Sequence, residues 1–261
     1  MFPFSDSDLK TETRPYVNWA LIGLCGLVFV YELIIGSTNQ SIFFYKFGVI
    51  PKELAHGFDF DTFRTVYGSH DISSPIPNWA TMFTSMFIHG GWMHLLGNML
   101  FLWVFGDNIE DRFGHFRYLL FYLAAGVAAT WLQIAVDTTS TAPTIGASGA
   151  IAGVLGAYLL LFPYSRVSTL VFFFFITVIK IPAFVILGFW FVLQFFSGVG
   201  SLGIEAQGGV AYWAHIGGFL MGMAVVAVYK RSKGESMWPR GPDAGSGGGS
   251  DAPRYWRGRR L

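Results

Sequence analysis

The sequence predicts an all-α membrane protein with six transmembrane helices. Hydrophobic residues make up 53% of its 261 residues and charged residues only 13%, whereas soluble domains carry about 25% charge. Apolar segments of about 20 residues, the length that crosses a bilayer as a helix, recur along the chain. The 27 Phe and 9 Trp suit lipid contact and interfacial belts.

The first apolar segment covers residues 16–36. The preceding residues 1–15 are polar and lack the basic start, apolar core and cleavage site of a secretory signal. We therefore expect a cytoplasmic N-terminal segment over 1–15 and a retained first helix. The stretch 37–78 is too charged to cross the membrane.

The second helix is expected at 92–109, after a short amphipathic segment that ends before Gly90 and Gly91. A turn containing "EDRFGH" then leads to a third helix at 116–136. The polar loop "DTTSTAPTI" separates it from a fourth helix at 147–162, which ends before Pro163.

Residues 169–197 are nearly all apolar, and as one helix they would be about 43 Å long. That is too long for one span and too short for two, and Lys180 and Pro182 interrupt the segment. We expect a short interfacial or re-entrant piece, followed by a fifth helix at 181–197. The sixth helix is expected at 211–229, which closes a membrane domain over 16–230. The tail 231–261, rich in Gly and Ser, should be flexible.

Charge indicates the orientation and excludes one class of partner. Lys and Arg gather after the second, fourth and sixth helices, which places both termini in the cytoplasm. The long first external loop departs from this trend with three basic residues, Lys46, Lys52 and Arg64. A net charge of +1 gives no reason to expect a nucleic-acid partner. We expect a multi-pass protein of the cell membrane.

Polar side chains at membrane depth are costly and usually functional or structural. His94 and Asn98 are four residues apart, so they share one face of the second helix. Two hydrogen-bond donors on one face could stabilise an oxyanion. The alternative is ordinary interhelical hydrogen bonding, worth about 0.6 kcal/mol on average.

Ser148 lies in "GASGAIAG" at the start of the fourth helix. A serine at such a position is often an N-cap. Small residues nevertheless form two stripes on this helix, so it can approach a neighbour closely. The stripes are Ser148, Ala152 and Gly156, and beside them Gly149, Gly153 and Ala157.

His215 lies in "AHIGGFLMG" at the start of the sixth helix, with Gly218 and Gly222 on its face. Packing of the two small-residue faces would bring His215 within hydrogen-bond reach of Ser148. The imidazole could then act as a general base toward the hydroxyl. Glu205 is the nearest acidic residue in the sequence, so a dyad is favoured over a triad.

Together these segments resemble the rhomboid family of intramembrane serine proteases, over about residues 15–230. "GASGA" resembles the family's nucleophile motif, with Ser148 between Gly146 and Gly149. "AHIGGFLMG" resembles the motif of the general base, His215, with Gly218 and Gly222.

Two further motifs support the resemblance. "HGGWMHLLGNM" resembles the signature of the second helix, with His94 and Asn98 in oxyanion-stabilising roles and His89 as a structural histidine. "EDRFG" resembles the pair that follows this helix, matching Glu110 and Arg112, which we place among the structural residues near the site.

The resemblance implies a rhomboid-like six-helix bundle with a water-filled cavity open to the external face. It implies cleavage of transmembrane protein substrates near the membrane boundary, through an acyl-enzyme on Ser148 whose backbone N–H completes the oxyanion hole. Membrane lipids are the other expected partners, and a small residue is expected before the scissile bond. No metal and no organic cofactor is implied.

One position departs from the family pattern. Some members carry a tyrosine four residues after the serine, stacked on the base histidine, and here that position is Ala152. Another group must therefore orient His215. Two alternatives remain: an inactive relative that binds membrane proteins, and a metal transporter with His89, His94 and His215 as ligands.

Overall fold

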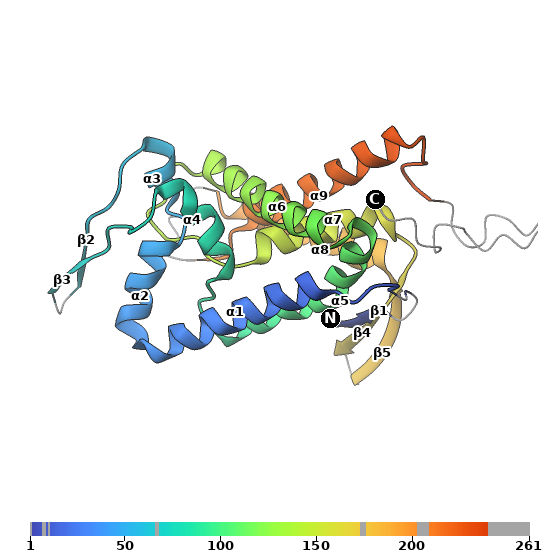
Figure 1. The fold of residues 1–261 in the computed structure, drawn as a ribbon, viewed down its shortest axis with the longest axis horizontal. Helices are drawn as coiled ribbons and strands as arrows, with labels where there is room; N and C mark the ends of the chain where they lie inside the picture. The colour runs from blue at the N-terminus through green and yellow to red at the C-terminus, as the bar shows by residue number, and fades with distance from the viewer. Residues whose placement is uncertain are drawn as a thin grey trace, which may run out of the picture.

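A computed structural model describes residues 2–6, 9, 11–65, 68–172, 176–202 and 209–239. Its fold is mostly helical, as expected (Figure 1). The expected segments correspond to six of its helices: α1 (Tyr16–Ile34), α5 (Trp92–Phe113), α6 (His115–Val136), α7 (Ser148–Leu161), α8 (Ala183–Gly200) and α9 (Tyr212–Ser232). Most of the tail 231–261 lies outside the described residues.

Four of these helices, α1, α6, α8 and α9, are long and apolar enough to cross a membrane. This finding supports a membrane protein with several spans. The apolar α7 has only 14 residues. The last turns of α5 carry the acidic residues Asp107, Glu110 and Asp111 together with Arg112.

Successive long helices run in opposite directions. The backbone N–H of Asn18, at the start of α1, donates to Oε2 of Glu110 near the end of α5 (2.7 Å). Lys230, at the end of α9, donates to the carbonyl of Leu160 at the end of α7 (2.6 Å). Arg112, near the end of α5, lies 3.9 Å from Glu235, which follows α9. One end of the bundle therefore holds the starts of α7 and α9, and the other holds the start of α1 and the end of α9.

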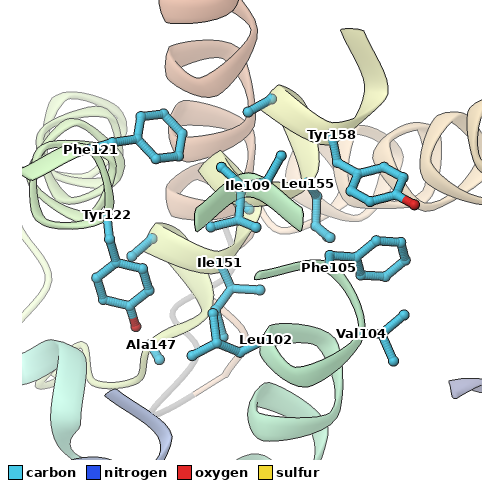
Figure 2. Packing of buried hydrophobic residues seen from close by; sticks show 14 of the residues in the cluster. Leu102, Val104, Phe105, Ile109, Phe121, Tyr122, Ala147, Ile151, Leu155 and Tyr158 are labelled. Carbon is cyan, nitrogen blue, oxygen red and sulfur yellow. The ribbon is translucent and has the colours of Figure 1, made fainter. Parts of the chain in front are cut away.

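The core of the bundle is α7. Every residue from Gly149 to Leu161 is buried, so this helix is packed by protein on all sides, as its uniform apolarity predicts. Figure 2 shows Ile151, Leu155 and Tyr158 of α7 among side chains of α5 and α6. These neighbours are Leu102, Phe105, Ile109, Phe121 and Tyr122.

The expectation of an all-α chain is wrong in two regions, a three-stranded sheet and a separate hairpin within residues 62–71. Residues 166–182 contain an antiparallel pair of strands, β4 (Arg166–Phe172) and β5 (Ile176–Pro182), where we expected an interfacial or re-entrant piece before α8. The β-branched residues that recur in both strands favour this conformation. A third strand, β1 (Phe2–Asp6), pairs antiparallel with β4.

This sheet joins the N-terminal segment to the bundle, so residues 2–6 are part of the folded domain rather than a separate extension. The order of its strands is β1-β4-β5. Thr13 adds a second attachment, because its backbone N–H donates to Asp111 on α5 (2.8 Å).

The charged stretch after α1 has secondary structure of its own. It forms α2 (Gly36–Phe47), α3 (Pro51–His56) and a hairpin of β2 (Thr62–Thr65) and β3 (Gly68–Asp71). The expected amphipathic segment appears as α4 (Asn78–Thr84) and a 3-10 turn (Ser85–Phe87). In Figure 1 these elements lie at the opposite end of the molecule from the sheet of β1, β4 and β5.

Candidate active site

Ser148 is the first residue of α7 and is partly buried. It does not cap the helix: the N-cap residue is Ala147, and no side chain makes a cap hydrogen bond there. Its Oγ instead lies 2.7 Å from Nε2 of His215. The hydroxyl is therefore paired with an imidazole from another helix.

Close packing of α7 against α9 produces this pairing. The two helices share the most extensive contact of any pair of described elements. A Cβ at Gly218 would collide with the carbonyl oxygen of Gly149, and one at Gly222 with that of Gly153. Only glycine on α9 permits this approach, which is the geometry expected for small-residue faces in membranes.

His215 is held on its other side by α8. Its Nδ1 lies 2.7 Å from Oε1 of Gln194, and the ring of Trp190 lies 5.8 Å from the imidazole at an interplanar angle of 33°. These two residues hold the imidazole of His215 in place of the tyrosine ring that is absent at Ala152. The sequence carries a signal for Gln194, which is the one amide or charged side chain within residues 183–200 and lies four positions after Trp190.

His94 and Asn98 face the loop that leads to Ser148. A Cβ at Gly146 would lie 2.6 Å from Nε2 of His94 and 3.8 Å from Nδ2 of Asn98. The amide of Asn98 also donates to the carbonyl oxygen of His94 (3.0 Å). The side chains of His94 and Asn98 therefore lie beside Gly146, which is two residues before Ser148 in the sequence.

His89 is fully buried and contacts a residue that sequence reasoning missed. Its backbone N–H donates to Oε1 of Glu32 on α1 (3.1 Å), and its ring packs against that of His94 at 5.2 Å. Its Nδ1 lies 3.2 Å from the carbonyl oxygen of Phe87. His89 therefore links α1 to the start of α5, beside the site.

Glu110 and Arg112 lie away from this site, which corrects their placement near it. They are at the far end of α5, and at 1.5 Å per residue Glu110 is about 24 Å along the helix from His94. Glu110 accepts from the backbone N–H groups of Val17 (3.0 Å) and Asn18 (2.7 Å) at the start of α1. Its carboxylate thus satisfies donors that a helix start leaves free.

A small cavity of about 20 Å³ lies beside Ser148, which is room for about one water molecule. Small and hydroxyl-bearing residues line it, among them Ser85, Gly126, Thr130, Thr144 and Ala214. The space next to the serine therefore suits a water molecule or a group of similar size. Within the described ranges, no group of three or more His, Cys, Asp or Glu side chains is arranged to hold a metal ion.

This fold and site define a polytopic membrane protein with a serine–histidine pair between two tightly packed helices. A model of the rhomboid domain matches residues 77–232, more than half of the chain. The chain belongs to the rhomboid family.

Several proteins of this family are similar to it. It is 44% identical over 81 residues to "Rhomboid protease GluP" of Bacillus subtilis, a match that covers 31% of this chain and 15% of that protein. It is 30% identical over 144 residues to "Rhomboid protein 1, mitochondrial" of Saccharomyces cerevisiae, covering 53% and 38%. It is 35% identical over 101 residues to "Rhomboid-like protein 11, chloroplastic" of Arabidopsis thaliana, covering 38% and 33%. The matches thus span well under half the length of these relatives.

Proposed function

We propose that this protein is an intramembrane serine endopeptidase that cleaves transmembrane proteins near the membrane boundary. The observation that carries the proposal is the distance of 2.7 Å between Ser148 Oγ and His215 Nε2. A hydroxyl hydrogen-bonded to a neutral imidazole can lose its proton as it attacks. One similar protein, that of Bacillus subtilis, bears the name of a protease.

In the proposed reaction, Ser148 Oγ attacks the carbonyl carbon of the scissile bond while its proton passes to His215 Nε2. The C–N bond then breaks, and the imidazolium gives that proton to the departing amine. This leaves an ester between Ser148 and the N-terminal part of the substrate. Water attacks the ester, its proton passes through Nε2 back to Ser148, and the acid is released.

The oxyanion that forms during each attack needs donors. We assign this role to the side chains of His94 and Asn98 and to the backbone N–H of Ser148. The first two face the loop next to the serine, and the third is at a helix start, where N–H groups are unpaired and the dipole favours negative charge. Loss of one such donor typically costs about 10²–10³-fold in kcat.

We place the chain in the cell membrane with six helices crossing it, α5 and α7 included, and with both termini in the cytoplasm. The directions of the helices support this arrangement, since the start of α1 and the end of α9 both lie beside the end of α5. Ser148 then lies near the external face. The cavity beside it, lined by small residues, favours substrates with a small side chain before the scissile bond.

The test is cleavage of a single-span substrate by the purified protein in liposomes. We expect cleavage by the parent, its loss in Ser148→Ala and His215→Ala, and its retention in the matched controls Ser41→Ala and His56→Ala, whose residues are exposed. Cleavage by Ser148→Ala at the parental rate would refute the assignment. A parent that neither cleaves nor reacts with a fluorophosphonate would favour an inactive relative that binds membrane proteins.

A further inference from the structure

His215 has two ring nitrogens, and the structure provides a neighbour for each. Nε2 faces Ser148 Oγ at 2.7 Å, and Nδ1 faces Gln194 Oε1 at 2.7 Å. His215 is 8% exposed, so little water is available to replace either neighbour. The position of the ring proton is therefore decided by these two contacts.

The chemistry of the two contacts is linked through the tautomer. A neutral imidazole carries one proton, so one nitrogen donates and the other accepts. If Nδ1 carries the proton, it can donate to the amide oxygen of Gln194, and Nε2 is free to accept from the hydroxyl of Ser148. If Gln194 instead presented its NH₂ group, Nδ1 would accept, Nε2 would carry the proton, and the ring could not act as a base toward the serine.

The ring is also held in position by α8. Trp190 and Gln194 are four residues apart on one face of α8, and both contact the imidazole. Trp190 packs in addition against Phe219 of α9 (5.9 Å), and Phe191 stacks on the same Phe219 (4.8 Å). Ala152, one turn after Ser148 on α7, is buried and too short to replace these contacts.

We propose that Gln194 is a positioning residue for His215: its amide oxygen accepts the Nδ1 proton and so holds the tautomer in which Nε2 faces Ser148. The inference rests on the proposed function for its catalytic consequence, but not for the hydrogen bond itself. Gln194 takes the place of the acidic member of a triad without adding a charge. An incorrect tautomer in a serine-protease triad lowers kcat by about 10⁴-fold, which shows how much depends on this proton.

Kinetics of three variants test the catalytic consequence. Gln194→Met has a similar volume and no acceptor. It should lower kcat by about 10- to 100-fold, less than complete loss of a general base, with KM little changed because a residue that acts through His215 does not alter substrate binding. Gln194→Glu keeps an acceptor oxygen and should recover most of the activity. The matched control Leu193→Met introduces the same residue on an exposed face of α8 and should leave kcat unchanged.

Nitrogen-15 NMR of histidine-labelled protein tests the hydrogen bond without using activity. The signals of His215 are identified by their loss in His215→Ala. We expect the parent to carry the proton on Nδ1, and Gln194→Met to show a shift toward the Nε2 tautomer or a mixture. A proton on Nε2 in the parent, or a kcat in Gln194→Met equal to that of Leu193→Met, would overturn the proposal. A parent that does not cleave would refute the proposed function, while the spectrum would still decide the role of Gln194.

Discussion

At the scale of single residues, Gly146 shows how a backbone position shapes the site. Its φ of +118° lies in a region that L side chains rarely adopt. The space beside its Cα is taken by the imidazole of His94. Gly146 therefore permits the backbone turn that leads into α7. It also leaves space for His94 of α5 to lie against that turn.

Substitution of Gly146 by Ala should affect stability and the site together. The strained φ costs of order 1–3 kcal/mol, and the added Cβ must displace His94. We expect a lower melting temperature and slower labelling of Ser148 by a fluorophosphonate. Both are measured on purified protein in detergent.

The matched control is Gly97→Ala in α5, where a Cβ would meet nothing within 4 Å. A glycine inside a helix costs about 0.5–1 kcal/mol relative to alanine, so this variant should be unchanged or slightly stabilised. Equal melting temperatures and labelling rates for both variants would argue against the role given to Gly146.

At the scale of secondary-structure elements, the contact between α7 and α9 determines whether the serine and the histidine meet. Gly149, Gly153 and Gly156 of α7 lie against backbone atoms of α9. Helices in a membrane associate through close packing rather than through the hydrophobic effect. A small increase in the separation of α7 and α9 should therefore lengthen the distance between Ser148 and His215.

We expect Gly218→Ala to separate α7 from α9, because its Cβ would collide with the carbonyl oxygen of Gly149. Overpacking of this kind typically costs about 1–3 kcal/mol, and the hydrogen bond between Ser148 and His215 should lengthen. Melting temperature and fluorophosphonate labelling should both fall. Gly188→Ala on α8, which has open space beside it, should leave both unchanged, and a Gly218→Ala variant indistinguishable from it would contradict the packing argument.

Asp6, in strand β1, is expected to make the stability of the protein depend on pH. Burial, with the neighbouring Asp107 carboxylate as a smaller cause, raises the pKa of Asp6 from 3.8 to about 7. The folded protein then binds more protons than the unfolded chain between these values, so stability should fall as pH rises from about 4 to about 7 and level off above. Asp6 accepts hydrogen bonds from Tyr158 (2.8 Å) and Asn108 (2.7 Å).

Asp6→Asn keeps an acceptor oxygen and removes the titration. The melting temperature of the parent minus that of Asp6→Asn should decline over this pH range. A control with Asp59→Asn, an exposed residue in the loop before β2, should retain the parental profile. A parental profile in Asp6→Asn as well would assign the slope to other groups.

At the scale of the whole molecule, the proposed topology can be tested with cysteine labelling. Cys25 is the one cysteine in the sequence, so a Cys25→Ser background gives a protein without thiols. A membrane-impermeant maleimide applied to intact cells should label Ser41→Cys on α2. Glu12→Cys and Ser232→Cys, both at exposed positions, should be labelled only after the membrane is permeabilised. Labelling of Ser41→Cys and Ser232→Cys from the same side would refute the topology.

The sequence by itself determined which segments become long helices and which family the chain belongs to. Length and continuous apolarity are local properties, so the positions of α1, α5, α6, α7, α8 and α9 could be read from them. The motifs around Ser148 and His215 indicated the family, which the match over residues 77–232 confirms. The small residues on α7 and α9 also predicted that these two helices would pack closely, since such faces have few other uses in a membrane.

Only the tertiary structure decided what depends on contacts between distant segments. The strand β1 forms because β4 offers it a partner about 160 residues later, and nothing within residues 2–6 indicates that partner. Glu110 was expected near the site. It lies instead beside the start of α1, because α5 is one continuous helix that separates Glu110 from His94. Gln194 contacts His215 because α8 packs on α9. That packing determines which way the glutamine side chain faces, and the sequence of α8 alone does not encode it.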